Sequence, residues 1–419
     1  MNIKSVRSAA LGALVVASCA SSLPALAQTG PRLSMADAPQ FVRQNDAAIL
    51  QRFKLYKSAG VRSLRTSLSF RDERPDGSWA PSNERWLRLA VQSGLHLRLE
   101  LETVSGPPAW FLAQNPGARL TNCNGEYSTN MISYWYPGFQ DLIASKTAKL
   151  VQYLYQTKLI NSVDTIIVDL GPAGEPLYPA PWTMGPGHTD ANEAFWFCGP
   201  GPQGDFQQAA QAKYRTLSAA NTRWGTRFAS WQDVRIDQQS QRTPAMWRDV
   251  LAWYRDAKRK FIVWQIGNVR SALSRYAPAG SVPLTILLPA DHISSAKWEK
   301  AVASDDGDTP IKVMTDTDFV IETAKQYHTS LQYTALPDNA ELSYITGQIA
   351  KSGAETPLWA ENVGSAPAAG NPAELAREAA TWRLQGVEFV NSGYLFDPTG
   401  SRPTPVWGKY VAAFAGAAQ

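Results

Sequence analysis

Apolar residues along this chain recur in two alternating spacings, which predict strands separated by helices. Short runs that are apolar nearly throughout predict seven strands, at 61–70, 95–102, 163–170, 282–288, 329–336, 356–360 and 387–393. Stretches with helical spacing of apolar positions predict helices at 42–59, 82–93, 139–157, 205–221, 244–275, 316–327, 338–352 and 372–385. Glycines such as Gly60 and Gly94 follow several of these helices, as expected of a helix end. A weaker eighth strand is predicted at 31–35, PRLSM.

This order predicts the α/β class and, within it, a (β/α)8 TIM barrel. Strands that are apolar on both faces are typical of a parallel sheet covered by helices. Eight strand–helix units close a barrel, whereas seven or fewer would also suit an open doubly wound sheet. No G-x-G-x-x-G follows the first clear strand, which disfavours a dinucleotide-binding sheet. We expect residues 28–419 to form a single catalytic domain, with long loops after the third strand (103–138) and the fourth (171–204).

The first 27 residues are typical of a secretory signal peptide. Lys4 and Arg7 precede an apolar run, and Ala25-Leu26-Ala27 forms a small-x-small cleavage site. The alternative is a lipoprotein signal, because VASC at 16–19 resembles a lipoprotein cleavage site that would leave a lipidated Cys19. We therefore expect a periplasmic or secreted protein or, in the alternative, an outer-membrane lipoprotein. No later apolar stretch is long enough to span a bilayer.

Charge and motif content exclude several function classes. The net charge is +4 over 419 residues, which gives no electrostatic case for nucleic-acid binding. The four histidines show no H-x-H or H-x-x-x-H spacing, so we expect no metal site. Neither a phosphate-binding loop nor a G-x-S-x-G motif occurs, and we expect no cofactor.

Two cysteines remain after the signal, Cys123 and Cys198, one in each of the two long loops. In an oxidising compartment a disulfide between them is expected, and it would tie the loops together. The alternative is a pair of buried, unpaired thiols.

Two carboxylates are predicted at the end of the barrel where active sites lie. Glu175 follows the fourth strand by a short turn, GPAG, and Glu361 directly follows the seventh strand. The active sites of such barrels lie at the carboxyl ends of the strands, so both side chains are expected at one mouth. Two carboxyl groups, one protonated and one ionised, are the minimal apparatus of glycoside hydrolysis. The alternative is that each is a structural carboxylate at a strand end.

Further residues are candidates for contact with a carbohydrate. Glu102 ends the third strand, although an outward orientation or a structural pairing with Arg65 or Arg98 is equally consistent with its position. Asp291 follows the fifth strand and would bind a hydroxyl or cap the next helix. Aromatic faces stack on the C–H faces of sugars, and Trp135, Tyr178 and Trp182 lie in the two long loops; loop packing is the alternative for each.

The amino-acid sequence around these carboxylates resembles that of the β-amylase family of glycoside hydrolases. DLGPAGEPLYP at 169–179 is similar to a signature of that family, and YTALPD at 333–338 and ETPLWAENVGS at 355–365 follow in the family's order. The resemblance implies that Glu175 is the general acid and Glu361 the general base of an inverting mechanism. It also implies that Asn362 and Thr334 contact the substrate, and it favours an α-glucan.

Other segments depart from that family. Its mobile loop after the third strand is absent, and PPAWF at 107–111 and WGTRFASWQDV at 224–234 resemble barrel β-galactosidases instead. Those enzymes place Asn directly before the acid, whereas Gly174 stands there in this chain. Two alternatives therefore stay open: a retaining, β-galactosidase-like hydrolase, and a carbohydrate-binding barrel without turnover.

Overall fold

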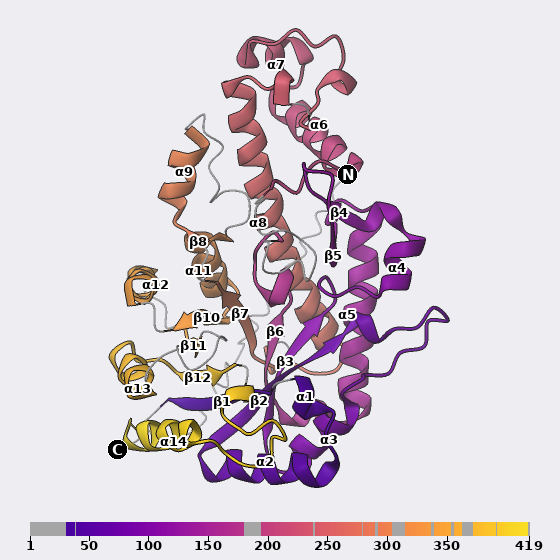
Figure 1. Cartoon of the computed structure of the whole chain (residues 1–419). Coiled ribbons are helices and arrows are strands. Elements are labelled where there is room, and N and C mark those ends of the chain that lie inside the picture. The colour runs from indigo at the N-terminus through magenta and orange to yellow at the C-terminus, as the bar shows by residue number, and fades with distance from the viewer. Residues whose placement is uncertain are drawn as a thin grey trace, which may run out of the picture.

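Eight parallel strands close into a barrel in the computed structural model of this chain (Figure 1). The structure describes residues 31–37, 39–179, 194–237, 239–278, 280–289, 292–303, 315–336, 339–352, 356–362, 372–390 and 392–417. Around the barrel the strands are β1 (Arg32–Ala36), β2 (Val61–Ser69), β3 (His96–Glu102), β6 (Val163–Val168), β7 (Leu284–Leu288), β10 (Ser330–Leu336), β11 (Leu358–Asn362) and β12 (Gly386–Phe389).

The first strand closes the ring. Leu33 in β1 is in register with Val61 of β2 on one side and with Val387 of β12 on the other, so this sheet has no open edge. The predicted (β/α)8 barrel is confirmed, including its weakest strand.

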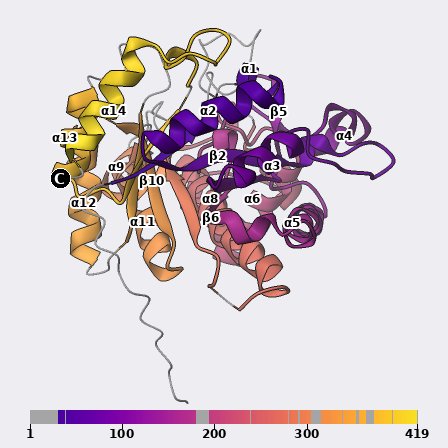
Figure 2. The ribbon, with the colours of Figure 1, turned by 90° about the horizontal axis from the view of Figure 1, so that it is seen from below.

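Helices surround the strands, as the view from below shows (Figure 2). They are α1 (Pro39–Val42), α2 (Asp46–Ser58), α3 (Glu84–Gln92), α4 (Ala109–Gln114), α5 (Phe139–Gln156), α6 (Pro200–Tyr214), α7 (Leu217–Trp224), α8 (Pro244–Ser274), α9 (Ser295–Ala303), α11 (Thr317–Gln326), α12 (Asn339–Ser352), α13 (Pro372–Thr381) and α14 (Pro405–Ala417). Helix α8 begins where Thr243 accepts a hydrogen bond from the Met246 amide and Pro244 takes the first helical position. None of the described helices is both long and apolar enough to cross a membrane.

The long connection after β6 forms an extension of the barrel. Helices α6, α7 and the first half of α8 project beyond the barrel at one end (Figure 1). The single helix predicted at 205–221 is wrong: Arg215 adopts a φ of 62°, which ends α6, and Thr216 caps α7 by accepting from the Ala219 amide.

The loop after β3 also has structure of its own, because β4 (Arg119–Thr121) and β5 (Tyr127–Ile132) pair as a hairpin. A short parallel pair, β8 (His292–Ile293) and β9 (Thr315–Asp316), lies outside the barrel sheet.

Charged groups are buried inside the barrel. Arg98 of β3 and Glu388 of β12 form an ion pair at 3.1 Å, and both side chains are buried. The Arg98 guanidinium also donates to Gln332 of β10 and lies 3.7 Å from the Trp359 ring centroid. An interior with this much polarity requires that each group be paired, and this pairing continues directly into the site described next.

Candidate active site

The loop that follows β6 places Glu175 over the barrel mouth. Gly174 has a φ of +80°, and a Cβ at this position would lie 2.4 Å from Oε1 of Glu100 on β3. Glycine is favoured there, because another residue would be strained by the positive φ and would displace the Glu100 carboxyl group from Arg65. The turn Gly-Pro-Ala-Gly therefore allows the chain to pass close to β3 and positions Glu175 over the end of the barrel.

Glu175 lines a cavity and is held from β10. Its Oε1 accepts a hydrogen bond of 2.7 Å from the Thr334 hydroxyl. The cavity measures about 510 Å³ and is lined by Arg65, Arg71, Glu100, Glu102, Ser105, Gly106, Asn130, Pro172, Ala173 and Glu175. Thr334 was predicted as a site residue, and the structure places it against the first predicted carboxylate.

Glu361 ends up beside the same strand. Its Oε2 accepts hydrogen bonds of 2.7 Å from Arg65 and 2.7 Å from Gln332, and its side chain is 12% exposed. Gln332 and Thr334 are two residues apart on β10, so their side chains share one face of that strand. One face of β10 thus holds both predicted carboxylates, Glu361 through Gln332 and Glu175 through Thr334.

Arg65 joins three carboxyl groups. Besides Glu361, its guanidinium contacts Glu100 and Glu388, each at 3.2 Å. Together with Arg98, two guanidinium groups face three carboxyl groups in this cluster.

The imbalance of charge shifts the titration of the cluster. Burial raises the pKa of Glu361 to about 8, against the charge of Arg65, and Glu388 and Glu175 add to the rise. Burial likewise raises the pKa of Glu100 to about 8, again opposed by Arg65. For Glu388 burial also acts upward, but Arg65 and Arg98 outweigh it and the pKa is lowered. Near neutral pH, Glu100 and Glu361 therefore each bind a proton more readily than an ordinary glutamate does, whereas Glu388 ionises more readily.

Asp169 fixes the base of the loop. It accepts hydrogen bonds from the amides of Thr103, Val104 and Ser105 at 2.7–2.9 Å. Burial raises its pKa to about 6, although these hydrogen bonds oppose the rise. The ends of β3 and β6 are locked together at the mouth by this one carboxylate.

Two of the aromatic residues predicted to stack on a sugar, Tyr178 and Trp135, pack against other aromatic residues instead. The prediction that Tyr178 stacks on a sugar is wrong: it is 2% exposed, its ring stacks on Tyr254 at 4.0 Å, and its hydroxyl donates to the Tyr254 carbonyl. Trp135 is half-buried, packs against Trp253 and donates to Asp205, so it belongs to the α6–α8 side and not to the cavity lining.

The structure describes only some of the other residues predicted to contact a carbohydrate. Glu102 lines the cavity with Glu175, and it also lines an adjoining cavity of about 710 Å³. Of the two predicted partners for this strand, Arg65 pairs with Glu100 rather than with Glu102. Trp182 and Asp291 lie outside the described residues, as does the side chain of Asn362, whose backbone ends β11.

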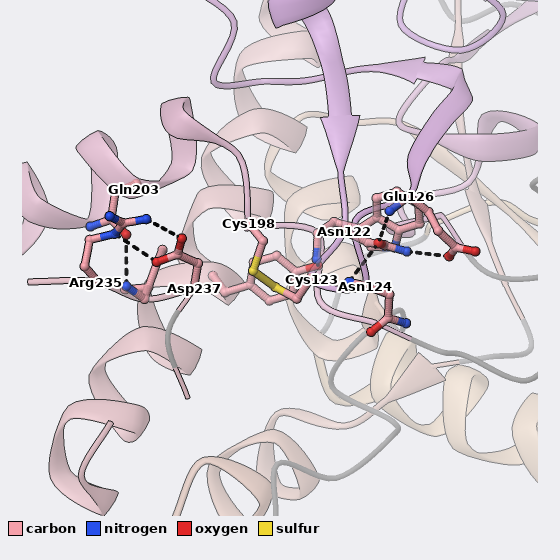
Figure 3. The surroundings of a disulfide bond; sticks show 11 residues. Asn122, Cys123, Asn124, Glu126, Cys198, Gln203, Arg235 and Asp237 are labelled. Carbon is pink, nitrogen blue, oxygen red and sulfur yellow. Dashed lines mark hydrogen bonds and ion pairs between the residues drawn. A yellow bond between two sulfur atoms is a disulfide. The ribbon is translucent and has the colours of Figure 1, made fainter. Parts of the chain in front are cut away.

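The predicted disulfide between the long loops is confirmed. Cys123 and Cys198 are bonded, with their Cα atoms 4.8 Å apart (Figure 3). Beside the bond, the Cys123 amide donates to the Phe195 carbonyl, and the Trp196 indole donates to the Pro179 carbonyl. The bridged segment is thereby attached to the end of the loop that carries Glu175.

Sequence reasoning missed three residues that hold the carboxylates. Glu388 is the one polar side chain of GVEF in β12, and Gln332 lies between Leu331 and Tyr333 in β10; a polar residue flanked by apolar ones in a parallel strand was the available signal. Arg65 was considered only as a partner of the third strand. Among the described residues, no cluster of His, Cys, Asp and Glu is arranged to hold a metal ion.

Comparisons with known proteins identify the fold. No family model and no curated protein matches the chain. Among solved structures, the catalytic domain of β-amylase from Paenibacillus polymyxa superposes with a TM-score of 0.74 at 14% identity, over 93% of this chain and 98% of that one. β-Galactosidases from Marinomonas ef1 and Bacillus circulans sp. alkalophilus give TM-scores of 0.62 and 0.64 at 12% and 13% identity. The alignments cover 93% and 92% of this chain but only 59% and 56% of those enzymes, so it spans little more than half their length. The chain thus has the barrel fold of the β-amylase catalytic domain and of the matched part of the β-galactosidases.

Proposed function

We propose that this protein is an exported glycoside hydrolase that cleaves O-glycosidic bonds of an oligo- or polysaccharide by inversion, with Glu175 as general acid and Glu361 as general base. The observation that carries the proposal is the convergence of these two carboxyl groups on one face of β10. The barrel fold shared with β-amylases and β-galactosidases supports it, and the resemblance at 169–179 favours an α-glucan.

The support for inversion is the resemblance around Glu175, which implies an acid and a base that act through a water molecule. Carboxyl groups roughly 6.5–9.5 Å apart leave room for the water that an inverting enzyme uses, whereas a retaining enzyme needs about 5–5.5 Å.

The hydrogen bonds suit the two roles. Thr334 donates to Oε1 of Glu175, and this hydrogen bond orients the carboxyl group that would protonate the leaving group. Arg65 donates to Glu361 and opposes the rise in its pKa that burial causes, so the ionised fraction of Glu361, and with it the rate, should increase as pH rises toward 8. Glu361 would then accept a proton from water through its second oxygen.

A second candidate is a carbohydrate-binding barrel without turnover. It is favoured by the same contacts, because one oxygen of Glu361 is already engaged by both Arg65 and Gln332. A retaining hydrolase with Glu361 as nucleophile is the remaining alternative within the enzyme class.

The test uses Glu175→Gln and Glu361→Gln with a panel of α-glucans, β-glucans and galactosides. A general acid or base contributes on the order of 10²–10⁴-fold, so kcat of each variant is expected to fall by at least that factor while binding of the substrate persists. Matching melting temperatures would show that both variants are folded. If the wild type binds a glycan from the panel but hydrolyses none, the binding barrel replaces the hydrolase.

A further inference from the structure

A buried lysine lies behind the loop that carries Glu175. Lys258 belongs to α8 and is 6% exposed. Its Nζ donates to the carbonyl of Leu170 at 2.9 Å, to the carbonyl of Leu177, and to the Tyr134 hydroxyl at 2.8 Å. Leu170 precedes the turn and Leu177 follows Glu175, so a single amino group joins the two ends of this loop.

The groups around the Lys258 amino group are aromatic rings and hydrogen-bonding oxygens. Its Nζ lies 5.2 Å from the ring centroids of both Tyr134 and Tyr178 and 5.6 Å from that of Phe261. Three oxygen partners surround the Nζ, so every N–H of the amino group has a hydrogen-bond partner in either protonation state. Burial lowers the pKa of Lys258 well below its ordinary value, and the charge of Asp169 opposes that change.

The loop itself is closely folded around this contact. Within it, the Gly174 amide donates to the Gly171 carbonyl, and the Leu177 amide donates to the Glu175 carbonyl. A Cβ at Gly171 would lie 2.6 Å from the carbonyl oxygens of both Glu175 and Leu177, and 3.3 Å from Nζ of Lys258. The backbone on either side of Glu175 is therefore packed directly against the lysine.

We propose that Lys258 is a positioning residue for Glu175, which fixes the proton-donating carboxyl over the cavity by joining the Leu170 and Leu177 carbonyls. This inference rests on the proposed function. Lys258 stands behind the loop and is absent from the cavity lining, so it acts through the backbone and does not touch substrate. A general acid must lie within hydrogen-bond reach of the leaving oxygen, and a displacement of about 1 Å costs on the order of 10²-fold in rate.

The decisive measurement compares two leaving groups. Lys258→Met removes all three donors but keeps the length of the side chain. We expect kcat on an oligosaccharide to fall on the order of 10²-fold, with KM changed by less than about threefold. The glycosyl fluoride of the same sugar needs little protonation of its leaving group, so its hydrolysis should fall less than about fivefold.

Arg259→Met is the matched control. Arg259 is the next residue of α8 and pairs with Asp316, away from the loop, so this variant loses an ion pair of the same helix. We expect its kcat to match the wild type on both substrates. Lys258→Gln, which retains two donors, serves if the methionine variant does not fold, and it should lose less activity on the oligosaccharide.

Amide hydrogen exchange gives a readout that needs no substrate. Exchange at Gly174, Glu175 and Leu177 should accelerate in the Lys258 variant and not in the Arg259 variant. Equal losses of rate on the two leaving groups, or unchanged exchange in the loop, would overturn the positioning role. If Glu175→Gln keeps full activity, the proposed function fails instead, and the exchange data still decide whether Lys258 holds the loop.

Discussion

Replacing Arg65 with methionine should destabilise the protein in a way that depends on pH. Arg65 contacts Glu100, Glu361 and Glu388, and its side chain is only 15% exposed. Removing one partner of a buried ion pair typically costs about 3–5 kcal/mol, because a charge is left uncompensated. We expect a loss of this size in the free energy of unfolding at pH 9, where all three carboxyl groups tend to ionise.

The sign of the pH dependence follows from the pKa values of the cluster. Glu100 and Glu361 have folded pKa values of about 8, above the ordinary 4.5, so they bind protons more tightly in the folded state. Their contribution to stability is present below pH 4.5 and is lost as pH rises through 8. Arg65 lowers both pKa values, so removing it raises them further and deepens the loss at high pH. Each unit of pKa corresponds to about 1.4 kcal/mol, and we expect the loss at pH 6 to be smaller by at least that amount.

Urea unfolding followed by tryptophan fluorescence at pH 6 and pH 9 measures both values. Arg71→Met is the control, since Arg71 lines the same cavity but is exposed, and its substitution should change stability by less than about 0.5 kcal/mol. A loss that is equal at the two pH values, or no greater than in the control, would refute the electrostatic reasoning.

Three further changes test individual contacts. Gly174→Ala should lower the free energy of unfolding by about 1–2 kcal/mol because of its backbone conformation, and by more because of the collision with Glu100. Gly77→Ala is the control, since Gly77 has a φ of +79° but lies in open space and should show the backbone cost alone. Equal losses in urea unfolding would contradict the close approach of Gly174 to Glu100. Thr334→Val removes the hydrogen bond to Glu175, worth about 1–1.5 kcal/mol, so kcat/KM should fall roughly tenfold on any substrate that the wild type hydrolyses, and an unchanged value would exclude Thr334 from the site. Replacing Cys123 and Cys198 together with serine should lower the free energy of unfolding by about 2–4 kcal/mol, and a variant as stable as the wild type would show that the bridge does not constrain the loops.

The barrel was predictable because its strands are short, apolar and separated by helices with clear spacing. The same regularity predicted both carboxylates near one end of the barrel. Glu175 lies past β6 as expected, whereas Glu361 lies within β11, close to its end, and not past it. The helix boundary at Arg215 was missed, although Thr216 is a capping residue and signals a new helix.

The pairing inside the site was not predictable from one sequence. Arg65 meets Glu361 and Glu388 at sequence separations of 296 and 323 residues, and no local pattern records which strands face each other. Tyr178 was a candidate because it lies in a long loop, where sequence does not separate stacking on a sugar from packing; the stacking of its ring on Tyr254 of α8 buries it.

The stereochemistry of hydrolysis tests the central claim most directly. A proton NMR time course with a soluble oligosaccharide shows which anomer forms first, before mutarotation. The resemblance to β-amylases around Glu175 predicts a product of inverted configuration, with no product from Glu175→Gln or Glu361→Gln over the same time. A product of retained configuration, or turnover by either variant at the wild-type rate, would contradict an acid and a base acting across one water-filled gap.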